Sequence, residues 1–145
     1  MRDLPRQLSV DELAGLFEGR TRFVEQLAEL EDPLGKAPRV ARELSEAEKK
    51  EVLDAHPAIG AKHLSERSAA EQGDDEDPAV LADLARLNRD YEERFGFRFV
   101  VFVNRRPKAA IVPILRERLE RTREQELATA LDELVAIAVD RWRRG

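Results

Sequence analysis

Both histidines of the chain, His56 and His63, lie in one short stretch. Histidine is the side chain best suited to move protons near neutral pH. Pro57 disfavours α-helical geometry at the preceding residue, His56, and Gly60 permits an unusual turn. We therefore expect the imidazole of His56 at the end of a helix, in a rigid corner. Glu71 and Gln72 follow with a carboxylate and an amide. Together these groups are suited to acid–base chemistry on a small polar substrate.

Each of these residues also has a purely structural interpretation. A histidine before a proline often does no more than end a helix. Ser68-x-x-Glu71 is a capping box, in which serine caps a helix and glutamate reaches back to the cap, and the same pattern recurs earlier in the chain. His56 and His63 could bind a metal, but two histidines without a cysteine or a third fixed ligand indicate one only weakly, so no metal site is predicted.

The composition indicates a soluble globular protein with one substantial core. The 145 residues are 42% hydrophobic and 38% charged, which fits a single domain over residues 1–145. A net charge of −5 argues against nucleic acid or an anionic membrane as the main partner. The absence of cysteine excludes disulfides and thiol chemistry and suits a reducing compartment. With no apolar run of about 20 residues and no signal-peptide core at the start, we expect a cytoplasmic protein.

Helices must position most of these residues. Capping residues followed by apolar positions at helical spacing predict three helix starts in the first part of the chain. These starts are Ser9, Thr21 and Ser45. A turn is expected at residues 31–35, a short helix at 39–44, and the helix from Ser45 should deliver His56. Short helical segments are expected over residues 61–67 and from Ser68, followed by an acidic surface loop at 73–78.

One segment is not helical in character. A clear helix over residues 79–95 should end at Gly96, and residues 97–103, Phe-Arg-Phe-Val-Val-Phe-Val, are aromatic or β-branched almost throughout. A single strand-like run cannot make a sheet, so we expect an extended segment buried among helices. Its backbone groups need partners, and these are either helices, side chains and water or a bound ligand.

The last part of the sequence places arginines where they could bind an anion. Arg105 and Arg106 form a basic turn that could hold a carboxylate or ureido oxygen, although such pairs are more often solvated. Helices are predicted over residues 108–121 and from Thr122. The apolar stripe of the last helix continues to Arg141, and a buried arginine needs an anionic partner. That partner could be a structural acid, a helix C-terminus or a substrate.

The predicted fold is therefore all-α, a single compact domain of seven or eight helices with one short extended segment near residues 97–103. Several features occur in a fixed order along most of the chain. They are His56-Pro57-x-x-Gly60, Ser68-x-x-Glu71-Gln72, Asn88-x-x-Tyr91-x-x-Arg94-Phe95-Gly96-Phe97-x-Phe99-Val100, Arg106 and Glu133…Ile137-x-x-x-Arg141. In these features the chain resembles the OHCU decarboxylase family, whose enzymes act on 2-oxo-4-hydroxy-4-carboxy-5-ureidoimidazoline. Each feature alone is a weak signal, whereas together they are specific.

The resemblance implies an all-helical, cofactor-free and mostly homodimeric enzyme for the last step from urate to (S)-allantoin. It implies that His56 is the catalytic acid or base and that Glu71 orients the substrate or the histidine. The remaining implied contacts bind the ureidoimidazoline substrate, some through side chains and some through the backbone of the extended segment. The residues concerned are Pro57, Ser68, Gln72, Phe99, Val100, Val101, Phe102, Val103, Arg106 and Arg141.

The chain departs from the family pattern beside these residues. Ala58 stands where the family often has an acid, Arg105 where it often has glycine, and the segment after Gln72 is acidic. Alternatives are therefore a decarboxylase of a related ureido acid, or a non-catalytic helical domain that binds a ligand or regulates. A metal-dependent hydrolase using His56 and His63 is a further alternative. Convergence of His56, Glu71 and Arg141 on one pocket would favour the decarboxylase.

Overall fold

Helices dominate the computed structural model, which describes residues 3–59 and 77–145. Seven helices lie in these two ranges, and neither range contains a strand. They are α1 (Val10–Phe17), α2 (Arg22–Ala28), α3 (Pro33–Glu43), α4 (Glu46–Asp54), α6 (Pro78–Phe95), α7 (Lys108–Leu119) and α8 (Arg123–Arg144). None of these helices combines the length and the apolar character needed to cross a membrane. The predicted all-α class is confirmed.

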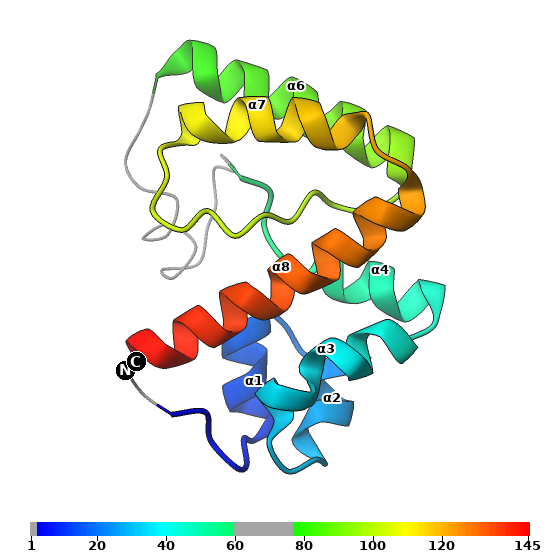
Figure 1. Cartoon of the computed structure of the whole chain (residues 1–145), viewed down its shortest axis with the longest axis vertical. Coiled ribbons are helices and arrows are strands. Elements are labelled where there is room, and N and C mark those ends of the chain that lie inside the picture. The colour runs from blue at the N-terminus through cyan, green and yellow to red at the C-terminus, as the bar shows by residue number, and fades with distance from the viewer. Residues whose placement is uncertain (1–2, 60–76) are drawn as a thin grey trace.

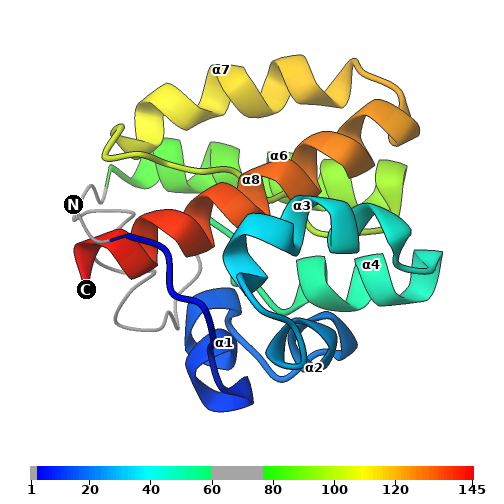
Figure 2. The same cartoon turned by 60° about the horizontal axis from the view of Figure 1, so that its bottom comes forward.

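The C-terminal helix α8 lies between two groups of helices (Figures 1 and 2). On one side, α6 and α7 pack against each other and run in the same direction. On the other side, α8 packs against α1, α3 and α4. Residues 97–103 return from the end of α6 to the start of α7 as an extended segment, next to α8. The predicted extended segment among helices is therefore confirmed.

Side-chain caps explain where the helices begin. Ser9, Ser45 and Thr122 each form a capping box, in which the hydroxyl accepts a backbone N–H three residues on and that residue's side chain accepts the N–H of the cap. Thr21 caps α2 through its hydroxyl. Gly96 ends α6 in the left-handed conformation, with φ of 80°. These helix boundaries agree with the sequence prediction.

The beginning of α3 differs from the sequence prediction. Residues 31–35 were predicted to form a turn, with a helix only over 39–44, but the helix begins at Pro33. Proline is well suited to the first helical position, because its missing N–H would have no partner there and its φ is already helical. Leu34 and Ala37 are buried on this helix, so packing also favours helix across the predicted turn.

Aromatic side chains fix the extended segment in the core. Phe97 and Phe99 are at most 2% exposed, and both rings meet Tyr91 of α6 edge-on, with centroids 5.9 and 5.2 Å away. Phe95, at the end of α6, stacks on Phe97. Edge-to-face contacts of this kind add to the free energy gained from burial. The segment therefore sits rigidly between α6 and α8 without a sheet.

Candidate active site

His56 lies just beyond the end of α4. The helix is fixed at its start by the Ser45 capping box and along its length by the buried side chains Val52 and Leu53. The backbone N–H of His56 still donates to Leu53, at 3.2 Å, and Pro57 then turns the chain away. The histidine is only 4% exposed. It therefore occupies the helix end that the sequence predicts.

Burial is the main influence on the charge of His56. It lowers the pKa of the imidazole from 6.5 to about 4, because the charged form loses its water. The positive charges of Arg141 and, to a smaller degree, Arg98 lower this pKa further, whereas Glu18 opposes them. Nε2 is buried and has no hydrogen-bond partner within residues 3–59 and 77–145. At neutral pH the ring is therefore uncharged, with one nitrogen available to another molecule.

Arg98 ties the extended segment to the end of α4. Its Nη1 donates to the carbonyl oxygens of His56, at 2.6 Å, and Asp54, at 3.0 Å. Its backbone N–H donates to Oδ1 of Asp54, at 3.0 Å. The position of the histidine thus depends on a residue 42 places further along the chain. Sequence reasoning missed this role, since nothing in the local pattern distinguishes Arg98 from a solvated arginine.

Arg141 projects from α8 and is 4% exposed. One guanidinium nitrogen lies 3.0 Å from Oε1 of Glu18, and the other donates to the carbonyl oxygen of Leu16, at 3.1 Å. Glu18 follows α1 in the left-handed conformation, with φ of 66°, which turns its carboxylate toward α8. Two of the three partners considered for this arginine, a structural acid and a helix C-terminus, are therefore present together.

His56 and Arg141 line the same cavity, which has a volume of about 310 Å³. Its described walls come from three places, namely the turn after α4, the extended segment with the turn that follows it, and the last turns of α8. The lining residues are His56, Pro57, Ile59, Phe99, Val100, Val101, Phe102, Val103, Asn104, Arg105, Ile137, Asp140, Arg141 and Arg144. This volume lies at the small end of the range for ligand pockets and suits a compact molecule.

The charges around the cavity are mostly positive. Among the described residues, Arg105, Arg141 and Arg144 line it together with a single carboxylate, that of Asp140. Nε of Arg144 lies 2.8 Å from Oδ2 of Asp140 and so compensates that acid. Arginine binds carboxylates and ureido oxygens through a planar set of donors. The cavity therefore has the chemistry to take an anion next to a neutral imidazole.

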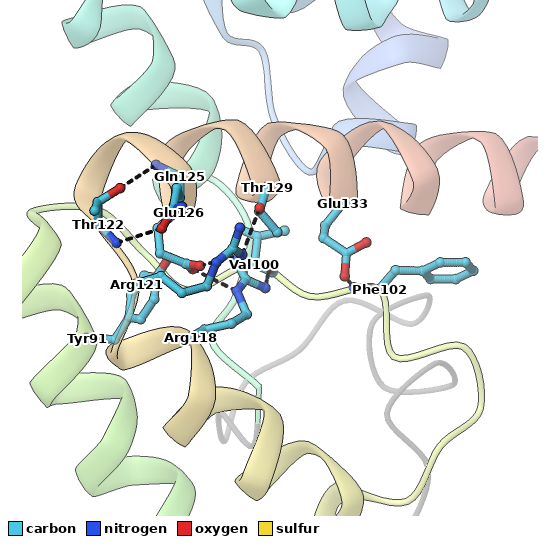
Figure 3. A network of polar contacts seen from close by, with 10 residues as sticks. All are labelled: Tyr91, Val100, Phe102, Arg118, Arg121, Thr122, Gln125, Glu126, Thr129 and Glu133. Atoms are coloured by element: carbon cyan, nitrogen blue, oxygen red, sulfur yellow. Dashed lines mark hydrogen bonds and ion pairs between the residues drawn. The ribbon is translucent and has the colours of Figure 1, made fainter.

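The extended segment contributes backbone groups as well as apolar side chains. Val100 accepts a hydrogen bond from Nη1 of Arg118, at 2.8 Å, and Phe102 donates its N–H to Oε1 of Glu133, at 3.3 Å (Figure 3). Between them, Val101 forms no hydrogen bond through either backbone group among the described residues. Side chains thus satisfy part of the segment, and the peptide groups of Val101 stay available.

Arg106 is turned toward the backbone rather than into the cavity. Its Nε donates to the carbonyl oxygen of Val103, at 2.9 Å, and its Nη2 to that of Phe102, at 2.6 Å. It is absent from the cavity lining, whereas the preceding residue, Arg105, is part of it. Asn104 and Arg105 both adopt positive φ, 49° and 62°, which reverses the chain at this rim. Arg106 therefore shapes the cavity wall in this structure.

Several sequence predictions fall outside the described residues. These are Gly60, His63, Ser68, Glu71 and Gln72, together with the segments predicted over 61–67 and most of 73–78. Within the described residues, no group of three His, Cys, Asp or Glu side chains is placed to hold a metal ion.

Sequence reasoning overlooked the neighbours of Arg141 on α8. Ile137, Asp140 and Arg144 stand four residues before, one before and three after it, and all line the cavity. Residues three and four apart share a helix face, so this spacing could have identified Ile137 and Arg144 once Arg141 was singled out.

Comparisons with known proteins place the chain in one family. The model of the OHCU decarboxylase family matches residues 2–143. A 2-oxo-4-hydroxy-4-carboxy-5-ureidoimidazoline decarboxylase of Haloferax volcanii is 33% identical over 105 residues, which is 69% of this chain and 62% of that protein. A similar protein of Halalkalicoccus jeotgali is 30% identical, and the match covers 67% of this chain and 58% of that protein. The chain thus spans about three fifths of the length of these relatives.

Solved structures show the same fold. A crystal structure of OHCU decarboxylase in the presence of (S)-allantoin superposes with a TM-score of 0.75 and 23% identity, and covers 90% of this chain and 94% of that one. A crystal structure of (S)-allantoin synthase gives a TM-score of 0.67 at 25% identity over 91% of this chain and 47% of that one. Since the family model extends over nearly all of the sequence, the chain belongs to the OHCU decarboxylase family.

Proposed function

We propose that this protein decarboxylates 2-oxo-4-hydroxy-4-carboxy-5-ureidoimidazoline to (S)-allantoin, as the last step of urate degradation. The observation that carries the proposal is the shared cavity of His56 and Arg141, in which a buried imidazole nitrogen lacks a described partner beside an arginine-rich wall. Membership of the family and the names of its relatives support the same reaction.

The reaction suits a cavity of this kind. The bond between the ring carbon and its carboxylate breaks, carbon dioxide leaves, and the electron pair moves into the adjacent conjugated imine, whose nitrogen takes up a proton from solvent. The hydroxyl group on that carbon loses its proton and becomes a carbonyl, while a proton adds to one face of the neighbouring ring carbon. Because the imine accepts the electrons, the protein has to orient the carboxylate, stabilise developing charge and move protons.

The residues of the cavity supply these functions. His56, neutral at pH 7, acts as the acid or base that exchanges protons with the ring. Arg141 and Arg144 bind the anionic side of the substrate, and the peptide groups of Val101 bind the ureido side. The rigid corner formed by His56 and Pro57 presents the imidazole to one face of the ring, so a single enantiomer forms.

Further roles are proposed from the family resemblance, first for residues that the structure does not describe. Glu71 orients the substrate or the histidine, and Ser68 and Gln72 bind the substrate. Among the described residues, Phe99, Val100, Phe102 and Val103 enclose the substrate, and Arg106 contributes by donating to the carbonyl oxygens of Phe102 and Val103. We further propose a cytoplasmic homodimer that works without a cofactor, which light scattering and metal analysis of the purified protein can test.

The decisive experiment generates the substrate in situ from urate with urate oxidase and hydroxyisourate hydrolase. Spontaneous decay gives racemic allantoin, so circular dichroism reports enzymatic turnover. Addition of the protein should raise the (S)-allantoin signal rapidly, and His56→Asn should lower kcat by about 10²- to 10⁴-fold while retaining the fold. Equal turnover by His56→Asn would remove this residue from the mechanism.

A second candidate is a decarboxylase of a related ureido acid. It is favoured by Arg105, which lines the cavity where the family often has glycine and so adds a cation at the rim. If the wild-type protein leaves the spontaneous course unchanged, related ureido acids with an additional anionic group are the next substrates to assay. Binding without turnover of any of them would instead indicate a ligand-binding domain.

A further inference from the structure

We propose that Arg118 and Glu126 are positioning residues, which hold the extended segment so that the peptide groups of Val101 meet the substrate in a fixed orientation. The inference rests on the proposed function, because it concerns substrate binding in the same cavity. Neither residue lines that cavity, so both act through the backbone of its wall.

Arg118 connects α7 to the extended segment. It is 5% exposed, and its Nη1 donates to the carbonyl oxygen of Val100, at 2.8 Å (Figure 3). Its guanidinium lies over the ring of Phe99, 4.6 Å from the centroid, so it contacts two successive residues of the segment. A lysine has a shorter and less directional donor group and would satisfy only part of this arrangement.

Glu126 fixes the guanidinium in turn. Its carboxylate is completely buried, and Oε1 accepts from Nε of Arg118, at 2.7 Å, and from the hydroxyl of Tyr91, at 2.6 Å. Oε2 accepts from Nη1 of Arg121, at 3.0 Å, which also donates to Thr129. The carboxylate therefore has partners on both oxygens, and Glu126 holds the side chain of Arg118, which comes from α7, from the facing helix α8.

Stability alone does not account for this network. Arg118 and Glu126 have side chains only 6% and 0% exposed, and removing two charges from water costs as much free energy as their attraction returns. Apolar side chains of similar volume would fill the space between α6, α7 and α8 equally well. What they could not do is hold a carbonyl oxygen of the cavity wall in one direction.

The segment is held on both sides of its available peptide groups. Arg118 holds the carbonyl of Val100, Glu133 accepts the N–H of Phe102, and Arg106 donates to the carbonyl of Phe102. Val101 lies between these contacts, lines the cavity, and forms no backbone hydrogen bond in the part of the chain that the structure describes. Rigid donors and acceptors bind a ligand at a smaller cost in entropy than mobile ones.

The test compares Arg118→Met and Arg118→Lys with the control Tyr91→Phe, which removes a hydrogen bond to the same carboxylate without touching Val100. With the ureidoimidazoline, Arg118→Met should raise KM by roughly tenfold, because the lost orientation weakens ground state and transition state alike, while kcat stays within about twofold. Arg118→Lys should recover part of the loss, and Tyr91→Phe should lower Tm without changing KM. An unchanged KM with a lowered Tm in Arg118→Met would overturn the inference.

A second measurement does not depend on turnover or on the folding of Arg118→Met. In the ¹⁵N-labelled wild-type protein, (S)-allantoin should shift the amide resonance of Val101, and the shift should shrink in Arg118→Lys but not in Tyr91→Phe. A wild-type protein without decarboxylase activity would contradict the proposed function, whereas a Val101 resonance unmoved by (S)-allantoin, or moved equally in Arg118→Lys, would contradict this inference.

Discussion

The uncharged state of His56 has a consequence for stability as well as for chemistry. Its pKa is about 4 in the folded protein and 6.5 in the exposed chain, because burial disfavours the imidazolium. Between these values the unfolded chain binds the proton more readily, so the free energy of unfolding falls as the pH is lowered from about 6.5 to about 4. The linked loss is about 3 kcal/mol, at about 1.4 kcal/mol for each pH unit.

This pH dependence can be isolated with His56→Gln. Urea denaturation of both proteins between pH 7 and pH 4 should show the wild type losing about 3 kcal/mol more than the variant. The comparison removes the contribution of carboxylates, which titrate in both proteins. Parallel stability curves for the two proteins would mean that the histidine is not buried in its neutral form.

Arg141 has two roles that a pair of substitutions can separate. It lines the cavity, and it also lies 3.0 Å from the carboxylate of Glu18. Arg141→Met should raise KM by about 10- to 100-fold through loss of a charged hydrogen bond to the substrate, and should also lower Tm. Glu18→Gln should lower Tm but leave KM near the wild-type value, since the guanidinium remains. Equal substrate affinity in Arg141→Met would mark the arginine as structural.

The same pair should move the pKa of His56 in opposite directions. Arg141 lowers this pKa and Glu18 raises it, so the acid limb of the kcat/KM profile should shift to higher pH in Arg141→Met and to lower pH in Glu18→Gln.

At the scale of elements, the sequence predicts what depends on neighbours along the chain. Ser9, Ser45 and Thr122 begin helices because their caps are satisfied within three residues, and Gly96 ends one for a similarly local reason. The helix that begins at Pro33 was mispredicted because Asp-Pro and a nearby glycine are also typical of turns, and only the burial of Leu34 decides between them.

Contacts between distant elements could not be predicted from local sequence patterns. The stripe of α8 predicts that Arg141 is buried and needs a partner, but it does not identify Glu18, which reaches it only through a left-handed residue at the end of α1. Likewise, the composition of residues 97–103 predicts an extended segment, while its contacts with Asp54, Arg118 and Glu133 depend on how the helices pack. The imidazole of His56 could be placed at a helix end, but its lowered pKa depends on burial by distant elements and on the charges of Arg141, Glu18 and Arg98.

At the scale of the molecule, the site depends on α8. This helix packs against α1, α3 and α4, runs beside the extended segment, and ends at the cavity with Ile137, Asp140, Arg141 and Arg144. Near its end, the indole N–H of Trp142 donates to the carbonyl oxygen of Asp3, at 2.9 Å. The residues that line the cavity therefore come from distant parts of the sequence, and the position of α8 decides their distances.

If apolar packing along α8 rather than surface charge holds the site together, substitutions of a buried and an exposed residue on this helix should differ sharply in how much they lower the free energy of unfolding. Leu134 is completely buried, and Leu134→Ala should lower the free energy of unfolding by about 2–5 kcal/mol, since the cavity left behind adds to the lost burial. Asp132 forms an exposed ion pair with Arg42, so Asp132→Ala should cost less than about 1 kcal/mol. Urea denaturation measures both losses. Neither residue lines the ligand cavity, so both variants should keep the wild-type KM well below their melting temperatures. A loss in Asp132→Ala as large as that in Leu134→Ala would instead assign the anchoring of α8 to its surface ion pairs.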